Sequence, residues 1–253
     1  MDFDISPILE RWDYVPGQIV VRRIKGFDGQ AKIQLRVDLG ILQMNAHGRP
    51  DGKRPFGHPS LLDYFEARLK QHQARHGGRD EGFRLKPEDC SRLQLEAIQY
   101  HHRYICLLEL EDFVAALRDT TRNLRLFDFV ARYAESEDAA WALQQFRPQL
   151  LLIETRARAG QCLKAGDHAT AIRHVGSGIE RIREFFQEHG RLDALEHSAE
   201  LHSLEEWREE LGRNRPLSRR EKLELDLNEA LLREDYETAA RVRDQLRSLE
   251  ASE

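Results

Sequence analysis

The hydrophobic period of this chain changes once, near Ser60, and this change limits the possible folds more than any other feature. Before Ser60, apolar and polar residues alternate over residues 33–39, which is the two-residue period of a half-buried strand. After Ser60, apolar residues recur every three to four positions, which is the period of amphipathic helices. The sequence therefore predicts a mainly α protein with a small N-terminal sheet.

Three runs near the N terminus have the composition of strands, and they are expected to form an antiparallel β-meander. They cover residues 18–24, 33–39 and 41–46. The second run alternates strictly, and its apolar members, expected to face the core, are Ile33, Leu35, Val37 and Leu39. Its polar members, expected to face solvent, are Lys32, Gln34, Arg36 and Asp38. Residues 48–59 are rich in glycine and proline, which predicts a long basic loop.

Helices are expected from residue 60 onward, with boundaries set by capping residues, prolines and glycines. The first begins at Ser60 and ends near the glycines at 77–82. The next are expected at residues 88–110, 112–134, 137–146, 148–165, 167–189 and 192–211. A break at residues 214–216 precedes the C-terminal segment. We therefore expect three domains, at 1–59, 60–213 and 218–253.

One turn sequence occurs three times, beginning at Leu108, Leu163 and Leu231. Each copy reads Leu-x-x-Glu-Asp or Leu-x-x-Gly-Asp, followed by a ring-bearing residue and, three positions later, by alanine. The aspartate is expected to cap the following helix, and the alanine to let two antiparallel helices approach closely. The chain is thus predicted to consist of antiparallel helical hairpins.

The middle copy is similar to a tetratricopeptide repeat. Small residues at Ala159, Ala171 and Gly178 fall at that family's spacing. The distances between copies differ from the regular repeat of about 34 residues. The resemblance implies a divergent, tetratricopeptide-like helical body.

The third copy belongs to a longer pattern, LELDLNEALLREDYETAARVRDQLRSL, at residues 223–249. This segment resembles the UvrB/UvrC motif, and the matching residues expected to bind a partner are Leu223, Leu227, Ala230, Tyr236, Glu237, Ala240, Arg243, Asp244 and Leu246. The resemblance implies a helical hairpin that pairs with a like hairpin on another chain, so the partner is another protein or a second copy in a homodimer. Folding of the hairpin back onto the helical body is the alternative.

Composition and missing motifs narrow the possible functions. The net charge of −5 provides no overall attraction to nucleic acid or to an anionic membrane. The sequence contains no CxxC pair for zinc, no P-loop, and no apolar run of about 18 residues. We therefore expect a non-enzymatic adaptor of the bacterial cytoplasm, with no metal, cofactor or membrane contact, and associated with DNA repair only through the resemblance.

The basic loop supports an alternative function, a nucleic-acid-associated factor. Arg49, Lys53 and Arg54 would contact phosphates. The other interpretation is that they are ordinary solvated charges, because no interleaved aromatic residues offer a stacking platform for bases.

Two groups of helix residues are the remaining candidates for chemistry. Asp119, Arg122 and Asn123 lie on neighbouring helical turns, where they line a groove for a polar ligand or form internal salt bridges. Adjacent residues on a helix point about 100° apart, so His101 and His102 are not expected to share a metal ion.

Overall fold

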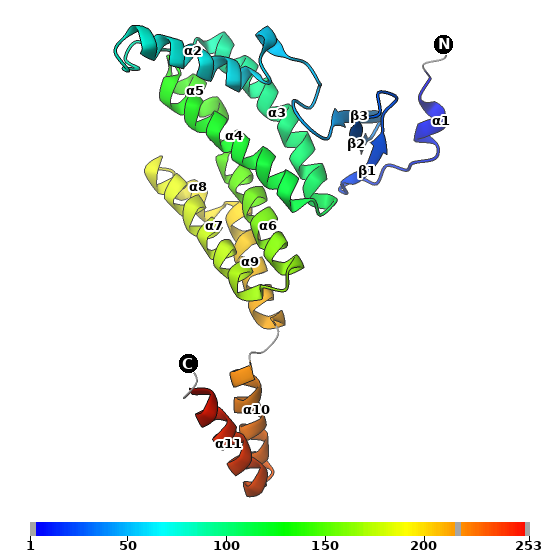
Figure 1. Ribbon diagram of the computed structural model, residues 1–253, viewed down its shortest axis with the longest axis vertical. Coiled ribbons are helices and arrows are strands. Elements are labelled where there is room, and N and C mark those ends of the chain that lie inside the picture. Colours follow the sequence, from blue (N-terminus) through cyan, green and yellow to red (C-terminus); the bar gives the residue numbers. More distant parts are fainter. Residues whose placement is uncertain (1–3, 216–218, 251–253) are drawn as a thin grey trace. The chain divides into compact units, whose positions relative to one another are not determined.

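The computed structural model describes residues 4–215 and 219–250. These residues are mainly helical, with one small N-terminal sheet and a C-terminal helical pair, as the sequence predicted (Figure 1). The chain divides into two compact units between Arg208 and Glu209. The first unit contains the sheet and most of the helices.

The sheet is the predicted antiparallel meander. Its strands are β1 (Val20–Lys25), β2 (Ala31–Val37) and β3 (Gly40–Asn45), in the order β1-β2-β3. In the register of the sheet, Val20 lies opposite Arg36 and Lys32 lies opposite Asn45. Ile33 and Leu35 are buried, as the alternation predicted.

The other face of β2 corrects one expectation, because Gln34 and Arg36 are buried rather than solvated. The N-terminal segment reaches this face, where Arg36 Nε donates to the carbonyl oxygen of Trp12 at 2.8 Å. The Gln34 amide donates to Gln43 Oε1, also at 2.8 Å. Both polar groups are therefore satisfied in the interior. Leu39, expected in the core, is exposed in the turn between β2 and β3.

Helices occupy most of the first unit, and those from α3 to α7 lie close to the expected positions. The helical elements are α1 (Ser6–Leu9), η1 (Pro55–Gly57), α2 (Leu61–Arg75), α3 (Pro87–Glu109), α4 (Phe113–Tyr133), α5 (Glu137–Gln144), α6 (Arg147–Lys164), α7 (His168–Glu188), α8 (Leu192–Glu196) and α9 (Ala199–Asn214). The prediction of a single helix at 192–211 is wrong, because two helices, α8 and α9, cover this range. Ser198 separates α8 from α9, because its Oγ accepts the backbone N–H of Leu201 at 3.2 Å and so caps a new helix.

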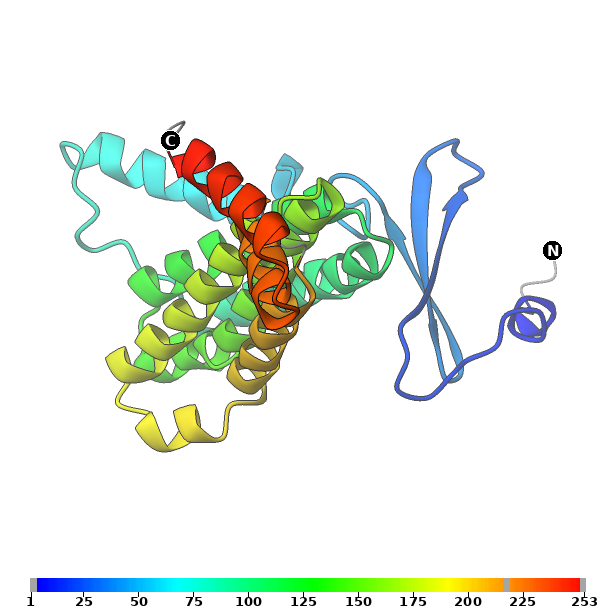
Figure 2. The same cartoon turned by 90° about the horizontal axis from the view of Figure 1, so that it is seen from below.

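The sheet and the helices share one core at the end where α3 and α4 join (Figures 1 and 2). The buried residues of this core are Ile33, Leu35, Met44, Ala46, Cys106, Leu107, Ala115, Ala116 and Ala157. Residues 4–59, from the segment expected as a separate domain at 1–59, therefore lie in the same compact unit as the helices up to Arg208.

Small residues let α6 pack closely against its neighbours. A Cβ atom at Gly178 on α7 would lie 2.2 Å from Oγ1 of Thr155, and one at Gly160 would lie 2.6 Å from the ring of Phe113. Ala159 and Ala171 are fully buried. The packing agrees with antiparallel hairpins, while the tetratricopeptide resemblance stays a prediction.

Candidate interaction site

The three repeated turns have the same backbone geometry. The residue before the capping aspartate has a positive φ in each: 53° at Glu111, 79° at Gly166 and 58° at Glu234. Each aspartate N–H then donates 2.9 Å back to a carbonyl oxygen near the end of the preceding helix, at Leu107, Cys162 and Ala230. A hydrogen bond from a backbone N–H to the carbonyl oxygen five residues earlier is typical of a helix that ends in a left-handed residue.

The aspartates cap the following helices, as the sequence predicted. Their Oδ1 atoms accept the backbone N–H three residues later: Asp112 from Ala115 at 3.2 Å, Asp167 from Thr170 at 2.9 Å, and Asp235 from Thr238 at 3.0 Å. The backbone N–H of Thr238, with its hydroxyl, lowers the pKa of Asp235 from the ordinary value of an aspartate. The charged form therefore caps the last helix at neutral pH.

The third turn joins α10 (Arg219–Leu232) to α11 (Tyr236–Glu250), which pack against each other as a hairpin. Four of its apolar residues are buried: Leu223, Ala230, Ala239 and Val242. Leu227 and Leu246 are half-buried. Of the expected partner-binding residues, Leu223, Leu227, Ala230 and Leu246 thus belong wholly or partly to the interior.

The other expected partner-binding residues are exposed. They are Tyr236, Glu237, Ala240, Arg243 and Asp244. Tyr236 exposes 70% of its surface, and the Arg243 guanidinium pairs with the Asp244 carboxylate at 3.1 Å.

The sequence interpretation missed three apolar residues on the outside of the hairpin, Leu225, Leu231 and Leu232. Leu232 is 86% exposed. Leu225 and Leu232 are seven residues apart, so they share one face of α10, and this spacing was the signal that could have revealed them. We call Leu225, Leu231, Leu232 and Tyr236 the apolar hairpin residues.

The basic loop contributes fewer free charges than its sequence suggests. Arg49 Nε lies 2.8 Å from Glu96 Oε2, and its Nη1 lies 2.6 Å from Asp51 Oδ2. The side chain of Arg49 is therefore held inside the first unit. Lys53 and Arg54 remain exposed.

Asp119 and Asn123 lie in the interior rather than at a surface groove. Asp119 accepts two hydrogen bonds from the Arg103 guanidinium, at 2.6 and 2.9 Å. Asn123 donates to the carbonyl oxygen of Ala97 at 3.0 Å. Arg122 pairs with Glu96. Arg122 also donates to Asn123 Oδ1 at 3.0 Å, so all three side chains take part in internal contacts, which is the salt-bridge alternative for Asp119 and Arg122.

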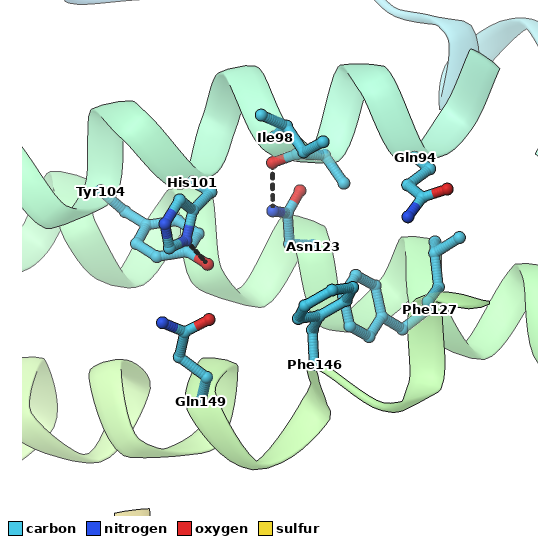
Figure 3. Close-up of a pocket in the computed structure, with 10 residues that line it drawn as sticks. Gln94, Ile98, His101, Tyr104, Asn123, Phe127, Phe146 and Gln149 are labelled. Atoms are coloured by element: carbon cyan, nitrogen blue, oxygen red, sulfur yellow. Dashed lines mark hydrogen bonds between the residues drawn. The ribbon is translucent and has the colours of Figure 1, made fainter. Parts of the chain in front are cut away.

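His101 and Asn123 help to line a cavity of about 250 Å³ between α3, α4, α5 and α6 (Figure 3). His101 Nδ1 is hydrogen-bonded to the Tyr104 hydroxyl at 2.9 Å. Burial lowers the pKa of His101, and the neighbouring His102 lowers it further, so the ring is neutral at pH 7. The ten residues that line this cavity in the described chain include no carboxylate, lysine or arginine. His101 and Tyr104 thus form a hydrogen-bonded pair in the lining of a mainly apolar cavity.

The described residues contain neither a cluster suited to a metal ion nor a helix suited to a membrane. Within residues 4–215 and 219–250, no group of three or more histidine, cysteine or acidic side chains is placed to hold a metal ion. No helix in these ranges has the length and apolar character needed to cross a membrane.

Comparison with known proteins identifies the hairpin. Residues 218–252 match the family model of the UvrB/UvrC motif, so α10 and α11 form a motif of this class. No curated protein matches the chain, and no solved structure matches it.

Proposed function

We propose that this chain is a non-enzymatic adaptor that docks a partner protein, or a second copy of itself, through the C-terminal hairpin. The main support for this proposal is that the UvrB/UvrC motif of this chain has exposed apolar side chains, the apolar hairpin residues. Tyr236 is of a residue type that is enriched among the anchors that contribute most of the binding energy in protein interfaces, and Leu232 adds exposed apolar surface near it in the sequence. Covering them would remove apolar surface from water.

The surroundings of the candidate polar residues support a binding role over a catalytic one. Asp119 is held by Arg103, and His101 is bonded to Tyr104, so both side chains have structural partners. Their contacts account for their burial without a substrate. We also propose a location in the bacterial cytoplasm, which was the expectation from the sequence.

The alternative function, a nucleic-acid-associated factor, loses support at the basic loop. It requires Arg49, Lys53 and Arg54 together, and Arg49 is paired with Glu96 and Asp51. Lys53 and Arg54 would act alone.

The test uses a full-length double variant, Leu232→Glu with Tyr236→Glu, and a control that adds the same charge at exposed polar positions, Asn228→Glu with Gln245→Glu. Light scattering measures the mass over a range of concentrations, and affinity capture from the native cell identifies stoichiometric partners. We expect the wild type and the control to self-associate or retain one partner, and the first variant to lose that association. Equal behaviour of all three proteins would refute docking through the hairpin.

A further inference from the structure

Three buried carboxylates in the first unit are each shared between two arginines. Glu96 on α3, Asp119 on α4 and Glu154 on α6 are at most 2% exposed. The ion pairs are Glu96 with Arg49 and Arg122, Asp119 with Arg103 and Arg118, and Glu154 with Arg158 and Arg181. We call these sets the arginine triads. Six guanidinium groups thus surround three carboxylates, although Arg49 has Asp51 as a further partner.

One arginine from each triad lines the same groove. The groove has a volume of about 600 Å³ and lies along α4 and α6. Its lining residues are Val114, Leu117, Arg118, Thr121, Arg122, Arg125 and Arg158. The stretch from Val114 to Arg125 covers roughly 16 Å of helix, which is the length of about five residues of extended chain.

The groove is positively charged because three of its arginines, Arg118, Arg122 and Arg158, share their carboxylates with other arginines, whereas Arg125 pairs with Asp63 and Glu66 on α2. The side chains of Arg118 and Arg158 are 42% and 43% exposed. No acidic residue is among those lining the groove in the described part of the chain. The interior carboxylates therefore fix the positions of the arginines while leaving positive charge at the surface.

Arg122 has a buried donor that the described residues leave without an acceptor. Its Nη2 reaches Glu96 and its Nη1 donates to Asn123 at 3.0 Å. Its Nε atom is buried and has no hydrogen-bond partner among the described residues. Leaving such a donor unsatisfied is unfavourable, so a small movement of this side chain that brings Nε to an acceptor in the groove would be stabilising.

Apolar side chains at the same groove distinguish a peptide from a nucleic acid. Val114 is 66% exposed, and Leu117 beside it is half-buried. No aromatic ring lines the groove within residues 4–215 and 219–250, so bases would find no stacking platform there. We propose that this groove binds an extended acidic segment of a partner protein. Its carboxylates contact Arg118, Arg122 and Arg158, and an apolar side chain packs against Val114.

This site lies on the first unit and does not depend on the hairpin. A chain with both sites bridges two partners, one at each unit. The test therefore addresses the groove alone, in the full chain.

The probe is a fluorescein-labelled peptide of about seven residues that alternates glutamate with leucine. Its glutamine counterpart and a single-stranded oligonucleotide of about twelve nucleotides serve for comparison. Fluorescence anisotropy measures the Kd of each for the full chain. We expect the glutamate peptide to bind at least about tenfold more tightly than either comparison probe, and its binding to weaken as salt increases.

The main variant combines Arg118→Gln with Arg158→Gln. Both changes leave a partner for the buried acid, since Asp119 keeps Arg103 and Glu154 keeps Arg181. The control, Arg132→Gln with Arg183→Gln, removes the same charge from an exposed arginine and a half-buried one, both outside the groove. We expect the main variant to lose about tenfold in affinity for the glutamate peptide and the control to change less than twofold, as estimated for charge-assisted and exposed pairs.

Val114→Gln distinguishes binding of an acidic peptide from binding of a nucleic acid, because it removes an exposed apolar contact and keeps every charge. We expect it to weaken peptide binding several-fold, on the order of one lost apolar contact. Three results would each overturn the proposal: no binding of the glutamate peptide at low salt, equal loss in the arginine variant and its control, or tighter binding of the oligonucleotide with no effect of Val114→Gln.

Discussion

Asp119 illustrates how a single residue helps to connect the helices of the first unit to its sheet. Its carboxylate is held by Arg103, whose Nη1 also donates at 2.8 Å to the carbonyl oxygens of Asn45 and Gly48. One guanidinium therefore links α3 and α4 to the end of the sheet and to the basic loop. Because every partner is supplied by the fold, the buried charge is tolerated.

Replacing Asp119 with alanine should strongly destabilise the first unit. The change leaves the positive charge of Arg103 buried with only carbonyl partners, and we expect a loss of about 3 to 5 kcal/mol. Urea unfolding followed by circular dichroism measures it. Asp128→Ala is the control, because Asp128 pairs with Arg147 at an exposed site, and its effect should be below about 1 kcal/mol. Similar values for both variants would contradict the assigned role of Asp119.

The thiols provide a second prediction at the level of residues. Burial raises the pKa of Cys90 to about 11 and that of Cys106 to about 12, so both are neutral at pH 8. Cys162 is only half-buried. Because the thiolate is the reactive form, iodoacetamide at pH 8 should modify Cys162 first in the native protein, and Cys90 and Cys106 only after unfolding. Peptide mass spectrometry measures each site. Labelling of Cys106 as fast as Cys162 in the folded chain would contradict this account.

At the scale of elements, local signals in the sequence predicted the repeated turns, whereas burial across elements was not predictable. The capping by Asp112, Asp167 and Asp235 depends on residues three positions away, so a short pattern contains the whole interaction. The burial of Arg36 depends instead on Trp12 in the segment before β1.

The same limit applies to the candidate sites. The pairing of Arg49 with Glu96 joins residues that are 47 positions apart, so nothing in the basic loop itself indicated it. The sequence offered internal salt bridges for Asp119 and Arg122 as one alternative, but it did not identify the partners in the arginine triads, since each triad combines residues from different elements. The hairpin was found because its matching residues are close together in the sequence.

The two glycines of α7 have opposite roles, which gives a matched test of helix packing. A Cβ at Gly178 would lie 2.2 Å from Thr155 Oγ1, whereas one at Gly176 would have no atom within 4 Å. Gly178→Ala should therefore destabilise the first unit by roughly 1 to 3 kcal/mol. Gly176→Ala should stabilise it by about 0.5 to 1 kcal/mol, because alanine favours the helix. Thermal unfolding of both variants tests this, and the same sign for both would show that α6 and α7 are not packed this closely.

At the scale of the whole molecule, the two units differ in how much apolar surface they bury. The first unit has a continuous core of helices and sheet, while the hairpin buries a few side chains between two helices of 14 and 15 residues. Helices of this length are marginally stable without packing. The hairpin should therefore open locally more often than α3 or α4.

This difference allows docking to be measured through hydrogen exchange. In the wild type at low concentration, amides of residues 219–250 should exchange much faster than those of α3 and α4. A partner that binds the folded hairpin stabilises it by mass action, by about 2.7 kcal/mol at a hundredfold excess over its Kd. Protection of the hairpin should consequently rise when the captured partner is added, or with protein concentration if the partner is a second copy.

The variants proposed for the docking test provide the control for this experiment. In the Leu232→Glu, Tyr236→Glu protein, protection of the hairpin should not respond to partner or concentration, because both changed side chains are exposed and belong to the proposed docking surface. The Asn228→Glu, Gln245→Glu protein should respond as the wild type does. Protection within residues 4–208 should stay constant in all three, since this unit has its own core. A response that is equally strong in both double variants would mean that the partner binds elsewhere and that the apolar hairpin residues are not its contact.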